Sequence, residues 1–277
     1  MRAVVVSWLS EVASEFCLQQ ETLFSAVSLL DRFLSSTEAV PRGVLQLAAV
    51  AACMVACKQD EVGGPDVDEL VGVAAGCFRR GDLLRMERIL LDAVSWRVRA
   101  PTAYTFLHLV GQALPGGLEP AAAALACYLA ELAGLDYATL QAPPSAVAGA
   151  ALLLAQATTA AAAAAWSSPP GDTLLPSSSS SAQWREVSAL TGHAPQDLAR
   201  LAAHLLGLQR AAEREAGLAA AAADAVARGG VAPAGAAAAA EGAPSAFVRD
   251  KYAAPAWLCA SVARPPLRAC PAPPPGL

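Results

Sequence analysis

The chain has 277 residues and a formal net charge of −5; 55% of its residues are hydrophobic, 5% aromatic and 16% charged. This length suggests one large domain or two of ordinary size. The acidic balance, without a cluster of basic residues, argues against a nucleic-acid-binding protein. Runs of alternating β-branched and aromatic residues are short, which argues against sheets. We therefore predict an all-α protein whose cores are built from Leu, Val and Ala.

The cysteines indicate the redox setting of the protein, and one long apolar segment raises the question of a membrane span. The seven cysteines are odd in number and include no C-x-x-C pair, so we expect free thiols in a reducing setting, without zinc or disulfides. Residues 146–166 are long enough to cross a membrane. Their many alanines and the preceding prolines instead favour a buried central helix. Residues 1–12 lead into no cleavage site, so we expect no secretory signal.

The first part of the chain shows helical spacing of apolar residues from residue 4 to residue 16. A second helix is predicted over residues 22–34 and a third over 41–58, where Pro41 suits a first helical turn. The third is apolar on nearly every side, as expected for a helix surrounded by others. Helices over residues 66–75 and 81–95 complete a set of five.

The same pattern then recurs. Five more helices are predicted over residues 101–113, 119–133, 144–165, 184–191 and 195–215. The third of these is again apolar and begins with a proline, so the chain contains an internal structural repeat. Low-complexity segments at residues 167–181 and 217–244 are predicted to be insertions in surface connections. The Pro-rich end of the chain is predicted to be extended.

Several collinear runs resemble cyclins of the mitotic A/B group, and the A type more than the B type. They are MRAVVVSWLSEV at residues 1–12, LDRFLSS at 30–36, VACKQDE at 55–61, RAPTAYTFL at 99–107, CYLAELAGLDY at 127–137 and VRDKY at 248–252. The resemblance implies two tandem five-helix cyclin boxes, over residues 1–100 and 101–266, and a tail over 267–277. It also implies a leader and an N-terminal helix upstream, so we expect the first helix to be incomplete or the chain truncated.

The resemblance implies a kinase-activating subunit with no chemistry of its own. In the family, a Lys from the third helix and a Glu from the fifth bond to kinase backbone; the matching residues are Lys58 and Glu87. Only two of the 19 basic residues are Lys, so Lys58 stands out against the preference for Arg and favours a requirement for a compact ammonium. The alternative is a solvated Lys at a helix end. Further positions assigned to this surface are Gln59, Asp60, Glu61, Trp96 and Val98.

For three of these positions the sequence does not decide whether the residue contacts the kinase. Gln59 replaces an aromatic residue that is usual after the Lys, which removes one expected apolar contact. Trp96 and Val98 would suit the interior of the first box equally well. Arg2 and Asp31 match a family pair that ties the first helix to the second, and a bidentate charge-assisted bond suits that role.

The first helix also resembles the family's docking groove for substrates and inhibitors that carry an Arg-x-Leu motif. Such a groove combines an apolar anchor pocket with a charge. The matching residues are Met1, Val4, Val5, Trp8 and Leu45 for the apolar slot, Gln46 for peptide backbone and Glu11 for the ligand's Arg. The alternative is that Val4, Val5 and Trp8 are ordinary core residues.

We therefore expect a cyclin that activates a cyclin-dependent kinase in the nucleus and cytoplasm and controls cell-cycle progression. It should need no cofactor or metal, since ATP and Mg²⁺ would belong to the kinase, and should bind neither nucleic acid nor membrane. His108, His193 and His204 lack Asp or Cys partners at the spacing of a nucleophilic site. The alternative is a cyclin-fold transcription or DNA-binding scaffold, which would require a basic surface.

Overall fold

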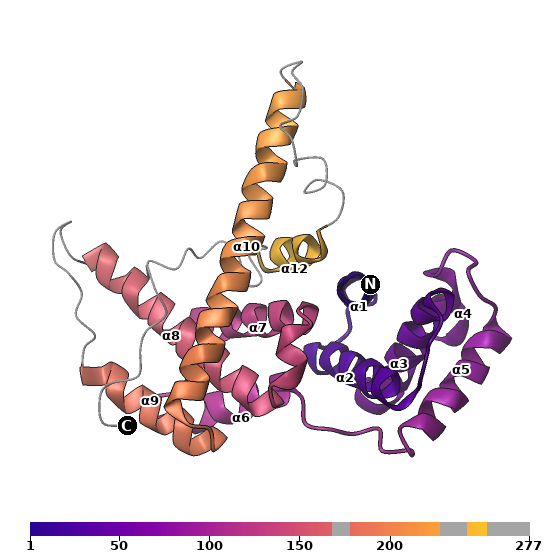
Figure 1. The fold of residues 1–277 in the computed structure, drawn as a ribbon, viewed down its shortest axis with the longest axis horizontal. Coiled ribbons are helices and arrows are strands. Elements are labelled where there is room, and N and C mark those ends of the chain that lie inside the picture. The colour runs from indigo at the N-terminus through magenta and orange to yellow at the C-terminus, as the bar shows by residue number, and fades with distance from the viewer. Residues whose placement is uncertain (168–177, 228–242, 254–277) are drawn as a thin grey trace. The chain divides into compact units, whose positions relative to one another are not determined.

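The structure is a computed structural model that describes residues 1–167, 178–227 and 243–253. Every regular element in these ranges is a helix, which confirms the all-α prediction. The chain divides into two compact units, Met1–Thr105 and Phe106–Leu277 (Figure 1). The elements in order are α1 Arg2–Glu15, α2 Gln20–Ser36, η1 Arg42–Val44, α3 Leu45–Asp60, α4 Val67–Gly72, α5 Arg80–Ala93, α6 Ala103–Ala113, α7 Pro120–Leu135, η2 Ala138–Gln141, α8 Pro144–Ser167, α9 Ser178–Thr191, α10 Pro195–Ala227 and α12 Pro244–Ala253.

Helix α3 is the centre of the first unit. It packs against α1, α2 and α5, and every residue from Ala48 to Cys57 is buried. This confirms that a helix apolar on all sides is the central one. The helix begins at Leu45 rather than at Pro41, because Pro41 has an extended backbone and a single 3₁₀ turn precedes the α-helical part.

Helix α8 has the same place in the second unit, with α7, α9 and α10 packed against it. Residues 146–155 are buried throughout. A Cβ atom at Gly149 would lie 3.1–3.3 Å from Thr191, Val187 and Leu198. The absence of a side chain there therefore lets α9 and α10 approach α8 closely. None of the helices in the described parts of the chain is both long and apolar enough to span a membrane.

The predicted insertions need correction. Helix α10 continues to Ala227, so the first part of the segment 217–244 is helical. Alanine has the highest intrinsic helix propensity, so this run extends the helix although Leu218 is 48% exposed. Similarly, the last serines of the segment 167–181 belong to α9. The remainder of both segments and the predicted tail at 267–277 lie outside the described residues.

Helix α12 completes the second unit by packing on α7 and α10. Its Tyr252 hydroxyl and Lys251 Nζ both donate to Glu131 Oε1, at 2.8 and 2.6 Å. Glu131 lies in the apolar middle of α7, where only 3% of its side chain is exposed. A carboxylate is costly in such a place unless a cation and hydrogen bonds accompany it. Helix α12 therefore supplies the charge that α7 requires.

Candidate functional site

Lys58 and Glu87 meet at the surface of the first unit. Lys58 lies in the last turn of α3, and α5 packs on α3 through Leu83, Met86 and Leu90, which places Glu87 beside the packed face. The Lys58 Nζ donates to Glu87 Oε1 at 2.5 Å. The Lys58 side chain is 55% exposed and that of Glu87 16%. Because the Lys58 end of the pair is exposed to water, which weakens its attraction to Glu87, the Lys58 ammonium can turn toward a partner.

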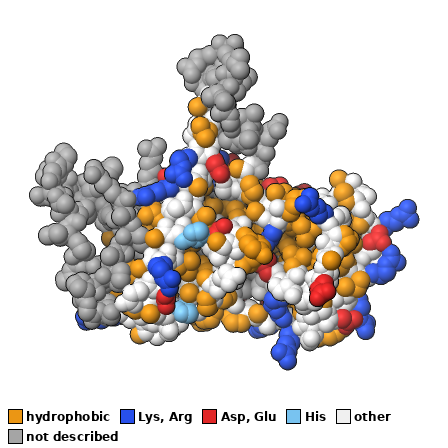
Figure 2. Space-filling view, viewed as in Figure 1, with side chains coloured by type: hydrophobic (Ala, Val, Ile, Leu, Met, Phe, Trp, Pro, Cys, Tyr) orange, Lys and Arg blue, Asp and Glu red, His pale blue; other side chains and the backbone are white. Residues whose placement is uncertain are grey.

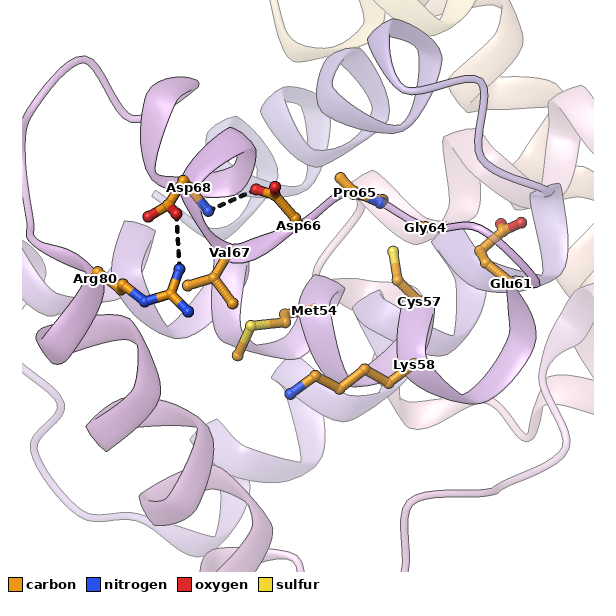
Figure 3. A pocket seen from close by; sticks show the side chains of 10 residues that line it. All are labelled: Met54, Cys57, Lys58, Glu61, Gly64, Pro65, Asp66, Val67, Asp68 and Arg80. Atoms are coloured by element: carbon orange, nitrogen blue, oxygen red, sulfur yellow. Dashed lines mark hydrogen bonds and ion pairs between the residues drawn. The ribbon is translucent and has the colours of Figure 1, made fainter.

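A pocket of about 420 Å³ lies next to Lys58 (Figure 3). Met54 and Val67 point into it, and the ion pair between Arg80 and Asp68, with 2.8 Å between Nη1 and Oδ2, lies at its other side. The full lining is Met54, Cys57, Lys58, Glu61, Gly64, Pro65, Asp66, Val67, Asp68 and Arg80. A hydrogen bond with Cys53, together with burial, raises the pKa of Cys57, so this residue stays a neutral thiol. The pocket therefore has an apolar floor and a charged rim.

The acidic residues after Lys58 serve the first unit itself. Glu61 Oε1 accepts hydrogen bonds from the Gln19 backbone N–H at 2.7 Å and from the Thr22 hydroxyl at 2.6 Å. It thus satisfies free donors at the start of α2, which is the task of a capping residue. The Asp60 side chain is largely buried and accepts from the Gln59 amide at 3.0 Å. Sequence reasoning assigned these residues to the partner and missed their internal contacts.

Replacing Glu61 with alanine is expected to lower the free energy of unfolding by about 1 kcal/mol, the usual value of a helix cap. Thermal unfolding of the variant measures this loss. Glu38, an exposed residue in the loop after α2, supplies the control, since Glu38→Ala removes the same charge without a cap. If Glu61→Ala melted like the control but lost kinase binding, Glu61 would be a contact residue and not a cap.

Trp96 and Val98 lie in different environments. Val98 is partly buried against the core of the first unit. Trp96 is 58% exposed and has a φ of +57°, which is uncommon for a bulky residue. Its indole N–H donates to Asp92 Oδ1 at 2.9 Å, and the Arg88 guanidinium lies 5.6 Å from the ring centroid. A large aromatic held at the surface in this way is a typical anchor for a partner protein.

The predicted docking residues line up along α1. Met1, Val4, Trp8 and Glu11 follow one another at spacings of three and four, so they lie on one face of the helix. Met1, Val4 and Glu11 are exposed, whereas Trp8 is partly buried and packs against the core. Two further members, Val5 and Leu45, and the polar Gln46 are partly exposed. The stripe is therefore neither wholly core nor wholly surface.

Arg2 fixes the orientation of this stripe relative to α2. Its guanidinium donates from Nε to Asp31 Oδ1 at 2.6 Å and from Nη2 to Oδ2 at 2.7 Å. This is the bidentate geometry expected from the sequence. Both side chains are mostly shielded from water, which strengthens the bond relative to an exposed pair. The first two helices are thereby tied together at the start of the chain.

Two histidines have partners that the sequence did not indicate. His204 Nε2 lies 2.6 Å from Asp136 Oδ2, a contact that the spacing of the two residues in the sequence did not indicate. The two residues are 68 positions apart, and only the packing of α10 on α7 brings them together. His193 Nε2 lies 2.8 Å from the Ser145 hydroxyl. Within the described ranges, no group of three or more His, Cys, Asp or Glu side chains is placed to hold a metal ion.

Comparison with known proteins finds two family matches along the chain. "Cyclin, N-terminal domain" matches residues 1–99, and "Cyclin, C-terminal domain" matches residues 101–216. Relatives include Cyclin-B2-2 of Arabidopsis thaliana, 41% identical over 148 residues, and Cyclin-A1-2 of the same plant, 39% identical over 151 residues. Each match covers 53% of this chain and 34% of the relative. Since the two identities are nearly equal, the preference for the A type stays a prediction.

A solved structure shares the fold. A viral cyclin from herpesvirus saimiri superimposes with a TM-score of 0.58 at 19% identity. The match covers 74% of this chain and 83% of the viral protein. It agrees with the arrangement of two tandem helical boxes around α3 and α8.

Proposed function

The chain belongs to the cyclin family, and on that premise we propose that it is a non-catalytic regulatory subunit that binds and activates a cyclin-dependent serine/threonine kinase. It would act in cell division, in mitosis in particular, in the nucleus and cytoplasm. It would need no cofactor, because the kinase would hold ATP and Mg²⁺. The observation that carries the proposal is the meeting of Lys58 and Glu87 at an exposed edge between α3 and α5.

Kinases require an assembled ion pair between a strand lysine and a glutamate of their regulatory helix for phosphoryl transfer. A subunit that binds the assembled state more tightly shifts the kinase toward it. When the weak pair between Lys58 and Glu87 opens, it provides an ammonium donor and a carboxylate acceptor for backbone groups of that helix. Trp96 lies on the same unit and would add an apolar anchor.

Purification of the chain from a cell extract, followed by identification of the bound kinase and an assay of its activity, tests this proposal. A bound and activated cyclin-dependent kinase is the expected result. Retention on DNA at low salt without a kinase would instead favour a DNA-binding scaffold. Against that alternative, Lys and Arg are scattered among Asp and Glu on the face shown in Figure 2. Several arginines are also paired with acidic residues, such as Arg80 with Asp68 and Arg88 with Asp92.

We further propose that the stripe on α1 recruits substrates or inhibitors that carry an Arg-x-Leu motif. Met1 and Val4 offer exposed apolar surface, and Glu11 offers a negative charge two turns further along the same face. A short peptide with one basic and one apolar side chain fits this combination. Bonding of the peptide backbone would fall to Gln46.

Glu11→Arg is expected to lower phosphorylation of Arg-x-Leu substrates several-fold, because attraction to the ligand's Arg becomes repulsion. A short peptide substrate without the motif should be phosphorylated at the normal rate. Glu11 is exposed, so thermal stability should not change. This variant is a cleaner test than Trp8→Ala, since Trp8 packs against the core. Equal effects on both substrates would refute the docking role.

A further inference from the structure

Amine chemistry in this chain is confined to very few groups. Of the 19 basic residues, only Lys58 and Lys251 are lysines, and the rest are arginines, which do not act as nucleophiles at neutral pH. Any reaction that acylates a lysine side chain must therefore take place at Lys58 or at Lys251.

The two lysines differ in access to solvent. The Lys251 side chain is 14% exposed; its Nζ bonds to the buried carboxylate of Glu131 and lies 5.2 Å from the centroid of the Tyr252 ring. Its amine becomes available only when α12 leaves α7, which is a sub-global opening. The Lys58 side chain is 55% exposed at a helix end. Its bond to Glu87 is of the kind that opens easily.

We propose that Lys58 is a site of acylation by thioester acyl donors, and that this modification and kinase binding exclude one another. The second part rests on the proposed function. The deprotonated Nζ attacks the acyl carbon of the thioester, a C–N bond forms, and the C–S bond breaks. The sulfur leaves as a thiolate with the electron pair of the C–S bond, and the proton lost from Nζ passes through solvent to the thiolate, which becomes a thiol. The product is a neutral amide at Lys58.

The surroundings of Lys58 suit this modification. The neighbouring pocket of about 420 Å³ offers room for an acyl group, and Met54 and Val67 give it an apolar floor. Acylation removes the positive charge and the salt-bridge donor. Glu87, with only 16% of its side chain exposed, then loses its cation. The acylated surface would therefore lack the Lys58 ammonium that bonds to the kinase, and the Glu87 carboxylate beside it would have no neutralising cation. Conversely, a bound kinase would cover Lys58 and protect it.

The first test needs no kinase. The chain is incubated with acetyl coenzyme A, and acetylation of each lysine is followed by peptide mass spectrometry. Lys58 is expected to react on the order of a hundredfold faster than Lys251, because the buried pair must open before Lys251 can react. Comparable rates at the two lysines would overturn the assignment. This result does not depend on whether the chain activates a kinase.

The second test uses the complex with the kinase. Acetylation of Lys58 should slow when the complex is formed beforehand. In the free chain, the loss of kinase activation should follow the fraction of Lys58 acetylated. Lys251→Arg, which leaves Lys58 as the only lysine, should show the same loss. Unchanged acetylation of Lys58 in the complex, or full activation by the acetylated chain, would refute the mutual exclusion. A chain that activates no kinase even when unmodified would refute the proposed function instead.

Discussion

The double variant Lys58→Ala, Glu87→Ala is expected to lose kinase activation while the isolated chain stays folded. Each side chain would bond to kinase backbone across an interface closed to water. Leaving a buried group without its partner costs about 1–3 kcal/mol, so the two losses together should weaken binding by orders of magnitude. The fold should survive, because the double variant removes both charges together and leaves no unpaired carboxylate at the partly buried position of Glu87. Histone-type kinase activity and thermal unfolding measure the two quantities.

Two further variants sharpen this test. Lys58→Glu, Glu87→Lys keeps an ion pair within the chain but reverses its polarity toward the kinase, so it should also fail to activate. Asp197→Ala, Arg200→Ala removes an exposed pair from the second unit and should leave activity unchanged. Full activity from the first double variant would show that Lys58 is only a solvated residue at a helix end.

The largest effect on stability is expected at Lys251. Lys251→Ala leaves the Glu131 carboxylate buried without its cation, and breaking a buried pair from one side costs about 3–5 kcal/mol. Chemical unfolding followed by circular dichroism measures the loss. Asp250→Ala, at the exposed neighbouring position, is the control and should change little.

The double variant Lys251→Met, Glu131→Leu should recover part of this stability, although the Tyr252 hydroxyl also loses its bond to Glu131. Replacing both charges with apolar side chains of similar size removes the cost of burying them. A double variant as unstable as Lys251→Ala would mean that the packing of α12, and not the charge of Glu131, accounts for the loss.

The central helices could be predicted because a helix that is buried on all sides is apolar at nearly every position of its sequence. A helix that contacts neighbours around its whole circumference has no polar face, and both α3 and α8 lack one. The end of α10 was harder to predict. Its alanines have no distinct apolar face, so pattern reasoning assigned them to a loop, while helix propensity alone was enough to continue the helix.

Most polar contacts could not be predicted in the same way, because their partners are far apart in the chain; the pair of Arg2 and Asp31 was expected from the family resemblance alone. Lys58 and Glu87 are separated by 29 residues, and Glu131 and Lys251 by 120. The sequence did contain a signal for the second pair. Glu131 interrupts an otherwise apolar helix, and a buried carboxylate requires a cation. The role of Glu61 as a cap gave no comparable signal, since its partners lie at the start of another helix.

The small side chains of α3 have a consequence for which changes the first unit can tolerate. Ala48, Ala49, Ala51, Ala52 and Ala56 are completely buried, so neighbouring helices lie close to the α3 backbone. In most cores, truncation creates cavities and is the most damaging change. Here there is little left to truncate, and the damage should come from added volume, where a single extra methylene group can force the helices apart. Divergence along this helix is therefore expected to be limited by size more than by hydrophobicity.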